Sequence, residues 1–419
     1  MKKVLFVTSR LIYPVNDGRK VVLYNYCKGL SEKYNCKVRL FSLIDNDEEF
    51  LEQPKFIDYI YYANTPNKLE KIKNLIIKSL ILKKWPFQVS LYYSKKSKDK
   101  LEKVISEYKP DIVIADMART AEYLKTLDSS KYNKILDMDD ILSKRYERQL
   151  QNGRLGINSI GAYAKKLPSF LRRFLKSEKI MKVILCNEVN LLKKYERYIH
   201  NYFKSIIFVS PIEAEEFNKI IKENKSIDIT IGVDYEYFSE SVIKNKRDNL
   251  IVFLGNMFVA HNKDAIMFFI ESIFPRVLKE LPDSRLRIVG KCPEELKNSL
   301  SKNNNIEVTG EVEDIRYQIQ EATIAVAPLT YGSGIKTKVL ETMAMGVPTI
   351  TNDIGIEGID INDYLREKII KNNSDELSST IISLLNNKSF RNDIIEAQSK
   401  YIYENHQWDN ILKNFEAII

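Results

Sequence analysis

Residues 328–350 read PLTYGSGIKTKVLETMAMGVPTI, a strand end, a glycine-containing turn and a helix start in direct succession. The apolar strand ends at Pro328, and Gly332 and Gly334 allow a tight turn and a close approach of the backbone to a ligand. A helix is predicted to start near Ile335, and the free N–H groups and positive dipole end of a helix suit a diphosphate. The stretch therefore predicts a parallel α/β unit with an anion site at its turn.

Three charged side chains follow this turn. Lys336 and Lys338 place positive charge where a departing diphosphate would gain negative charge. Glu341 lies about one helical turn further on and can accept two hydrogen bonds from a vicinal diol such as a ribose. An ordinary strand–turn–helix with solvated lysines has the same pattern, so the stretch alone leaves both interpretations open.

Short apolar strands alternate with amphipathic helices along the rest of the chain, in two successive series. The first series has predicted strands at Val4–Thr8, Val38–Leu43, Ile57–Tyr62, Ile112–Ala115, Ile135–Asp137 and Ile206–Ser210. The second series has predicted strands at Leu250–Leu254, Leu286–Val289, Ile306–Val308, Ile324–Ala327 and Thr349–Thr351. The chain has 419 residues, more than one hydrophobic core usually fills. The pattern therefore predicts two doubly wound, Rossmann-like α/β domains, residues 1–240 and 246–400, facing each other across a cleft.

Composition narrows the class of protein. Hydrophobic residues make up 44% and charged residues 29%, which is typical of a globular chain. No apolar run reaches the length of a transmembrane helix or a signal peptide, and the four cysteines have no metal-ligand spacing, so a cytoplasmic protein with reduced thiols is expected. The net charge is +9, and it is concentrated: residues 1–245 have 45 Lys+Arg against 31 Asp+Glu, whereas residues 246–419 have 20 against 25.

Two segments of the basic half combine lysines with apolar residues at helical spacing. Lys68–Trp85 has six lysines and one glutamate, with Leu69, Ile72, Leu75, Ile76, Leu80 and Leu82 at helical positions. Lys165–Lys182 has seven basic residues and one acidic residue, interleaved with aromatic and aliphatic side chains. Such helices are typical of an anionic membrane surface, where the apolar face enters the acyl boundary. Core-facing helices with solvated lysines remain the alternative for each segment.

Several blocks of the sequence resemble one family. KVLETMAMGVPTI (338–350) is similar to the donor-site signature of GT-B glycosyltransferases, in particular retaining family-four enzymes that act on nucleotide sugars. Five further blocks follow the family's order and spacing: IFVSPIEAEEF (207–217), IGVDYEYF (231–238), FLGNMFVAHNKDAIMFF (253–269), RLRIVG (285–290) and IEVTGEVEDI (306–315). The resemblance thus covers almost the whole chain, and the Gly-Ile-x-x-Lys-Val-Leu-Glu form is similar to bacterial polysaccharide and exopolysaccharide sugar transferases.

The resemblance carries expectations for each part of the chain. It implies that the second domain binds the nucleotide sugar and that the first binds the acceptor. It also implies that a C-terminal helix, residues 401–419, packs back on the first domain. The implied reaction is a retaining, front-face displacement in which the leaving diphosphate helps to remove the acceptor proton, with no metal and no cofactor besides the donor. Lys336 and Lys338 would stabilise the leaving group.

The donor-site residues are assigned by matching positions. Glu341 matches the second glutamate of the family's Glu-x7-Glu motif, and Ser333 stands where the first glutamate is expected. Gly255 matches the glycine of a Gly-Arg loop, but Asn256 replaces the arginine, so Lys336 and Lys338 are expected to replace the usual diphosphate clamp. The other expected donor-site residues are Gly332, Gly334, Ile335, Thr337 and the loop Gly355–Gly358 with Glu357. His261 lies in a loop near the predicted cleft, the only histidine so placed.

Acceptor-side candidates follow strands of the first domain. They are Ser9, Arg10, Asp17, Gly18, Asp116 and Arg119. Gly18 precedes a predicted helix at Arg19, where it is either part of an anion site or a glycine needed only for the turn. Asp137-Met138-Asp139-Asp140 follows another strand, and an Asp-x-Asp at a strand end is the manganese–diphosphate site of GT-A glycosyltransferases. Contact of Asp139 or Asp140 with the acceptor, and capping of the next helix, are the alternatives, and we expect Asp140 to take part in catalysis without a metal.

The combined interpretation is a cytoplasmic glycosyltransferase, peripheral at the inner face of the cell membrane. Its expected partners are a nucleotide sugar, a glycan or lipid-linked glycan acceptor, and an anionic membrane surface. No helix-turn-helix, RNA-recognition or zinc signature supports nucleic acid as a partner. A non-catalytic GT-B subunit that binds a partner glycosyltransferase or a glycan is the alternative, suggested by Ser333 and by the missing Gly-Arg/Lys clamp.

Overall fold

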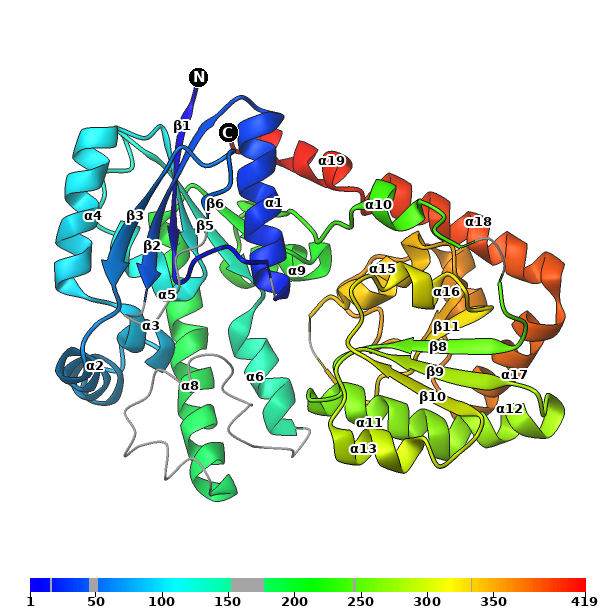
Figure 1. The fold of residues 1–419 in the computed structure, drawn as a ribbon. Helices are drawn as coiled ribbons and strands as arrows, with labels where there is room; N and C mark the ends of the chain where they lie inside the picture. Colours follow the sequence, from blue (N-terminus) through cyan, green and yellow to red (C-terminus); the bar gives the residue numbers. More distant parts are fainter. Residues whose placement is uncertain (16, 45–51, 152–176, 244–245, 333) are drawn as a thin grey trace. The chain divides into compact units, whose positions relative to one another are not determined.

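The computed structural model describes residues 1–15, 17–44, 52–151, 177–243, 246–332 and 334–419 (Figure 1). The chain forms two compact units: Met1–Ile229 with Leu412–Ile419, and Thr230–Ile411. The first unit ends at Ile229 and not at residue 240, because the Ile229 N–H still bonds to the Phe208 carbonyl of the first sheet at 2.9 Å. The Val233 N–H bonds instead to the His406 carbonyl at 2.8 Å, which ties the following residues to the second unit.

A parallel sheet of seven strands is the centre of the first unit, in the order β3-β2-β1-β4-β5-β6-β7. Its strands are β1 Lys3–Thr8, β2 Lys37–Ile44, β3 Tyr59–Asn64, β4 Ile112–Asp116, β5 Asn133–Asp139, β6 Ser205–Phe208 and β7 Ser226–Asp228. Phe6 of β1 pairs in register with Leu40 of β2 and Ile114 of β4, and all three are buried. Strand β7 was not predicted, because its three residues include the polar Ser226 and Asp228 and carry little apolar pattern.

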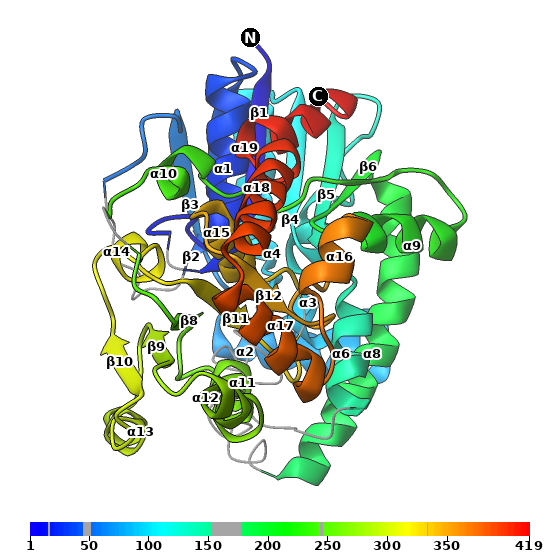
Figure 2. The same ribbon diagram turned by 90° about the vertical axis from the view of Figure 1, so that its right-hand side faces the viewer.

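Helices cover both faces of this sheet (Figure 1). They are α1 Gly18–Glu32, α2 Lys68–Asn74, the π-helix η1 Leu75–Ile81, α3 Phe87–Tyr92, α4 Lys95–Tyr108, α5 Ala118–Leu124, α6 Leu142–Gln151, α8 Glu178–Ile199, the 3₁₀ turn η3 His200–Tyr202 and α9 Pro211–Ile221. Figure 2 shows α6 and α8 packed side by side. Local sequence sets the starts of two helices: Asp17 accepts from the Lys20 N–H at 3.0 Å, and Ser210 caps α9 ahead of Pro211.

The second unit has a parallel sheet of five strands in the order β10-β9-β8-β11-β12. Its strands are β8 Leu250–Leu254, β9 Arg285–Val289, β10 Ile306–Gly310, β11 Ile324–Ala327 and β12 Thr349–Thr351. Its helices are α10 Tyr235–Ser239, α11 Ala260–Phe268, η4 Phe269–Ile273, α12 Phe274–Glu280, α13 Glu294–Leu300, α14 Arg316–Ile319, α15 Thr337–Ala344, α16 Asp363–Ile369, α17 Ser374–Asn386, α18 Lys388–Asn405 and α19 Trp408–Ile411. Two parallel, doubly wound sheets are the predicted architecture.

The C-terminal residues return to the first unit as the 3₁₀ segment η5, Leu412–Ala417. Phe415 is fully buried, and its ring lies edge-on to Tyr26 with centroids 5.0 Å apart. A side chain at Gly29 would come within 2.4 Å of Leu412, so glycine at this position lets the segment pack on α1. Trp408, by contrast, packs on Gly232 in the second unit, so the return begins at residue 412 and not at 401.

The structure describes the first of the two basic segments completely and the second only in small part. Lys68–Trp85 forms α2 and η1, which pack on the first unit through Leu75, whereas Leu69, Ile76, Leu80 and Leu82 are exposed and do not face the core. Most of Lys165–Lys182 lies outside the described residues. No helix in the described part of the chain is long and apolar enough to cross a membrane.

Candidate active site

The second unit brings its predicted ligand-binding residues to the carboxyl ends of β8 and β11. These strands are neighbours, and the chain winds away from them in opposite directions, to β9 and β10 on one side and to β12 on the other. In such sheets ligands bind at this switch point, outside the carboxyl ends of the strands. The helices that follow the two strands, α11 and α15, supply the side chains described next.

The turn between β11 and α15 requires its glycines. Gly332 has φ +154° and Gly334 has φ +74°, conformations that side-chain-bearing residues rarely adopt. Residue 333 lies outside the described residues, so its expected role is not placed. The helix begins at Thr337, two residues later than predicted, and Ile335 packs against the core of the unit instead of joining the helix. The turn thus exposes backbone at the start of α15.

Both lysines of the motif are drawn into the protein. Lys336 is 7% exposed, and its Nζ donates to the Gly334 carbonyl at 2.5 Å across the turn. Lys338 donates from Nζ to Asn262 Oδ1 at 2.6 Å and lies over the Phe253 ring, 4.8 Å from its centroid. Burial lowers the pKa of Lys338 to about 8, although Glu341 opposes this. Neither side chain is a solvated surface lysine, so that alternative fails for both.

Glu341 lies one turn into α15, beside Thr337 and Lys338. Burial raises its pKa to about 7, against the hydrogen bond from Thr337 and the charge of Lys338, which both lower it. A half-buried carboxyl with an elevated pKa is costly to keep, and such groups are enriched at functional sites. Its position at the switch point makes it available to accept hydrogen bonds from a ligand diol.

Asn262 of α11 connects this cluster to the loop after β8. While its Oδ1 accepts from Lys338, its Nδ2 donates to the Asn256 carbonyl at 3.0 Å. Glycine at position 290 allows close packing here, because a side chain there would begin 2.2 Å from the Gly255 carbonyl, and a side chain at Gly255 would begin 3.1 Å from Asn262. The Asn256 side chain accepts from the Phe258 N–H at 2.9 Å and stays within its own loop. Asn262 therefore links α15 to the loop after β8, a role that the sequence pattern did not indicate.

His261 lies in the same region, as expected. Its ring is 6.5 Å from that of Tyr331, whose hydroxyl donates to Asp264 at 3.0 Å. Burial, followed by the nearby charges of Lys338 and Lys336, lowers the pKa of His261 to about 4, so its imidazole is neutral at physiological pH. The site therefore offers two ammonium groups together with a neutral imidazole.

The loop after β12 lies near the end of β11. A side chain at Gly355 would start 1.8 Å from Thr351 Oγ1, which itself donates to the Ala327 carbonyl at 2.6 Å. Gly358 has φ +81°, and Glu357 lies half-buried between the two glycines. The expected loop Gly355–Gly358 is thus held against the strand that leads into the lysine-bearing turn.

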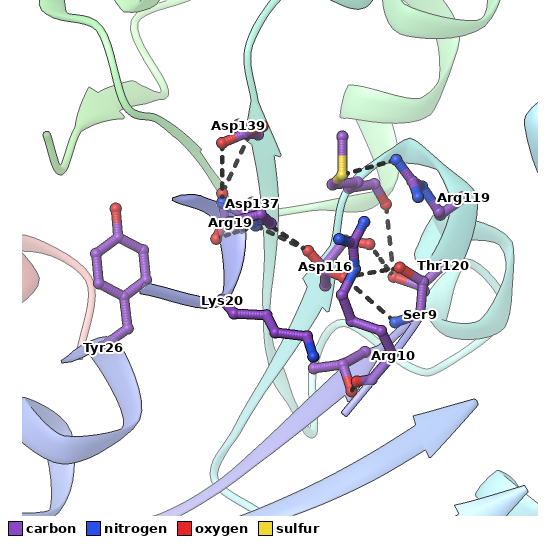
Figure 3. A network of polar contacts seen from close by, with 12 residues as sticks. Ser9, Arg10, Arg19, Lys20, Tyr26, Asp116, Arg119, Thr120, Asp137 and Asp139 are labelled. Atoms are coloured by element: carbon purple, nitrogen blue, oxygen red, sulfur yellow. Dashed lines mark hydrogen bonds and ion pairs between the residues drawn. The ribbon is translucent and has the colours of Figure 1, made fainter. Parts of the chain in front are cut away.

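In the first unit, a buried polar cluster occupies the corresponding switch point between β1 and β4 (Figure 3). Arg19 enters from α1 and donates from Nε to Asp116 at 3.0 Å. The same guanidinium reaches Asp137 at 2.6 Å and Asp139 at 3.2 Å, both at the end of β5. Ser9 completes the cluster, because its N–H and Oγ donate to Asp116 at 3.2 and 3.0 Å.

The charges of this cluster balance only in part. Arg19, Asp116 and Asp137 are all buried, with side-chain exposures of 7%, 0% and 0%. Burial raises the pKa of Asp137 to about 6 despite Arg19, whereas the pKa of Asp116 stays below its usual range because Arg19 and other cations outweigh its burial. The Asp-x-Asp residues thus face a guanidinium, and no group of acidic, histidine or cysteine side chains suited to a metal is found among the described residues.

Asp140 pairs with Arg145 of α6. Burial raises the pKa of Asp140 to about 6, although Arg145 opposes this. Asp139 has φ +70° and is 18% exposed, which makes it the more accessible of the two expected acceptor contacts. The structure therefore favours Asp139 over Asp140 as the carboxylate available to a ligand.

The remaining acceptor-side candidates have mixed positions. Arg10 reaches Asp17 at 3.6 Å, and both lie near the start of α1. The Asp17 carboxylate caps α1, and a side chain at Gly18 would meet open space, so packing does not require glycine at this position. Arg119 is buried, stacks 5.2 Å from the Tyr92 ring centroid and donates to the Met117 sulfur at 3.0 Å.

Two residues of the cluster were not singled out from the sequence. Arg19 and Arg145 stand at helix positions where an arginine usually faces solvent, and nothing local distinguishes them. Strand order could have indicated them. Polar residues at the carboxyl ends of adjacent parallel strands lie close together, and three aspartates there need a positively charged partner.

Comparisons with known proteins agree with this architecture. Residues 248–387 match the family described as Glycosyl transferases group 1. An uncharacterised 44.6 kDa protein of the cps region of Klebsiella pneumoniae is 23% identical over 418 residues, covering 97% of each chain. Sucrose-phosphate synthase from Thermosynechococcus elongatus superposes with a TM-score of 0.63 at 12% identity, over 99% of this chain and 98% of that one. HepE from Anabaena, solved with UDP and glucose, gives 0.57 at 12% identity, over 100% and 99%.

The two parallel, doubly wound sheets agree with the GT-B fold of these glycosyltransferase structures. The residues that match the Glycosyl transferases group 1 model, 248–387, include the lysine-bearing turn and α11.

Proposed function

We propose that this protein transfers a sugar from a nucleotide-diphosphate sugar to a hydroxyl of a lipid-linked glycan during assembly of a cell-surface polysaccharide. The observation that carries the proposal is the cluster of Lys336, Lys338 and Glu341 at the β8–β11 switch point. A relative from a cps region supports the polysaccharide setting, and a neighbour solved with UDP and glucose supports the donor class. In this proposal, the protein acts at the inner face of the cell membrane.

In the proposed mechanism, Glu341 accepts hydrogen bonds from the nucleotide ribose. Lys336 and Lys338 neutralise the departing diphosphate, and each such preorganised charge is worth about 2.7–4 kcal/mol of barrier. The reaction keeps the anomeric configuration, because the leaving phosphate takes the acceptor proton on the face from which it departs. The protein supplies position and charge, and the donor itself is the only cofactor.

A screen of nucleotide sugars tests the donor side. A true donor binds only the folded protein, so at about a hundred times its Kd it adds about 2.7 kcal/mol to the free energy of unfolding and raises the melting temperature. UDP sugars are the first probes. Glu341→Ala should lose this stabilisation, whereas Glu396→Ala, an exposed glutamate of α18, should keep it. Equal stabilisation of both variants would contradict the proposed ribose contact.

A further inference from the structure

The outer face of α2 and η1 exposes an unusual run of aliphatic side chains. Six of them are between 37% and 79% exposed, and we call them the aliphatic ridge: Leu69, Ile76, Ile77, Leu80, Ile81 and Leu82. Single exposed apolar residues are ordinary on protein surfaces, but a contiguous set on one short segment marks an interaction site.

The opposite face of the same segment is firmly packed. Leu75 and Ser79 are buried, and Ser79 Oγ lies 2.8 Å from Ser90 Oγ on α3. Asn74 Nδ2 donates to the carbonyls of Ser90 and Tyr93 at 3.2 and 2.9 Å. These contacts fix which side of the segment faces outward. The aliphatic ridge is therefore the outward face of a segment whose inner face is packed on the first unit.

Most of the ridge lies in the π-helix η1. In η1 the Leu82 N–H bonds to the Ile77 carbonyl, five residues back, at 2.9 Å. Within this turn, two pairs of residues spaced four positions apart, 76–77 and 80–81, are exposed. π-helical turns are rare and are frequently found at functional sites.

Positive charge borders the ridge. Lys68, Lys73, Lys83 and Lys84 are exposed, whereas the single glutamate of the segment, Glu70, accepts the Lys95 N–H at 2.9 Å. At the end of the segment the half-buried Trp85 ring lies 5.2 Å from Lys78 Nζ. Aliphatic residues bordered by lysines and an indole are the composition of a helix that lies in an anionic membrane interface.

The position of the ridge in the fold relates it to the polar cluster of Arg19. All seven strands of the first sheet are parallel, so their carboxyl ends lie at one edge. α2 begins four residues after the end of β3, and Ser9, Asp116 and Asp137 lie at the ends of β1, β4 and β5. Figure 1 shows α2 at this edge of the sheet. A surface that contacts the ridge is thus on the same side as the candidate acceptor residues.

We propose that the first unit docks on an anionic lipid bilayer by inserting the aliphatic ridge into the acyl boundary, with the bordering lysines at the headgroups. The proposal rests on the proposed function, because it names the surface that would present a lipid-linked acceptor. It differs from docking by charge alone in one measurable way. Salt screens the lysines over a Debye length of about 8–10 Å but does not weaken insertion, so part of the binding should remain at high salt.

Flotation with vesicles of phosphatidylglycerol and phosphatidylcholine tests this on the full chain. Leu80→Ser with Ile81→Ser should lower the partition coefficient at least about tenfold at both low and high salt, because two inserted side chains are lost. Lys83→Gln with Lys84→Gln should lower it mainly at low salt. Ile212→Ser is the matched control: it removes an exposed isoleucine at the start of α9, which connects β6 to β7 and is separated from β3 by strands β2, β1, β4 and β5.

Each outcome decides for or against the ridge. Wild-type protein that fails to float at low salt, or a double serine variant that floats like wild type, overturns the proposal. Concentration-dependent dimerisation in lipid-free solution, abolished by the double serine variant, would show that a second copy covers the ridge and would equally overturn it. Nucleotide-sugar binding measured on the same variants separates this proposal from the proposed function: it should equal wild type whether or not the ridge binds lipid.

Discussion

Replacing Glu341 by glutamine should stabilise the second unit and weaken donor binding together. Burial raises the pKa of this carboxyl from 4.5 to about 7, a difference that corresponds to about 3 kcal/mol. Because the pKa is raised on folding, the folded chain holds this proton more tightly than the unfolded chain. The free energy of unfolding therefore falls as pH rises from about 4.5 to about 7, and the loss remains above that range.

The glutamine variant carries no charge and keeps an oxygen that can accept from Thr337. At about pH 8 it should exceed wild type in free energy of unfolding by up to about 3 kcal/mol, whereas at about pH 5 the two should differ by less than about 1 kcal/mol. The affinity for a donor nucleotide should fall by about tenfold or more, because a charge-assisted hydrogen bond to the ribose is replaced by a neutral one.

Urea unfolding followed by tryptophan fluorescence measures this. The chain has two tryptophans, so in a Trp85→Phe background the fluorescence comes from Trp408. Trp408 packs on Gly232 and belongs to the second unit, as Glu341 does. Glu396→Gln, at an exposed position of the same unit, should show no comparable dependence on pH. A glutamine variant that is less stable than wild type at about pH 8, or that binds nucleotide as tightly, would refute the reasoning for Glu341.

Three further predictions concern charge. Because burial lowers the pKa of Lys338 to about 8, kcat should fall as pH rises through about 8 and the ammonium loses its proton. Asn262→Asp places a carboxylate against Lys338 and should move this fall to higher pH. A rate that stays constant well above pH 8 would contradict the role of Lys338. Arg19→Met should cost about 3–5 kcal/mol of stability in urea, because it leaves Asp116 and Asp137 buried without their cation, and a cost below about 1 kcal/mol would show that the carboxyls protonate at little expense. Chelators should leave turnover unchanged, and activity lost with chelator and restored by manganese would assign a metal to these aspartates.

The regular parts of the fold were predictable because the two sheets are parallel and buried. Strands such as β8 and β11 are short apolar runs, and the glycines at 332 and 334 mark the turn that follows β11. β7 was missed because an edge strand of three residues needs no apolar pattern. Hydrophobic periodicity thus predicted the strands and helices that bury apolar side chains. It did not predict a strand that is defined by its hydrogen bonds alone.

The candidate site was predictable only where it is local in sequence. The lysines and Glu341 lie within one turn and one helix, so their spacing carries the information. The pairing of Arg19 with Asp116 and Asp137 joins residues about a hundred positions apart, and it follows from the strand order β1-β4-β5, which the sequence does not state. Exposure of the ridge was likewise beyond periodicity, because helical spacing shows that apolar residues share a face but not whether that face packs on the core.

Transfer of a radiolabelled sugar tests the central claim most directly. Purified protein is incubated with each labelled nucleotide sugar and a lipid extract from cells that make a surface polysaccharide, and label in the organic phase is compared with release of nucleoside diphosphate. The account predicts that wild type moves label into lipid in step with diphosphate release, and that Lys338→Ala lowers this rate by about a hundred- to a thousandfold. Tight binding of a nucleotide sugar with no transfer to any lipid or soluble glycan acceptor, or equal transfer by Lys338→Ala, would contradict it.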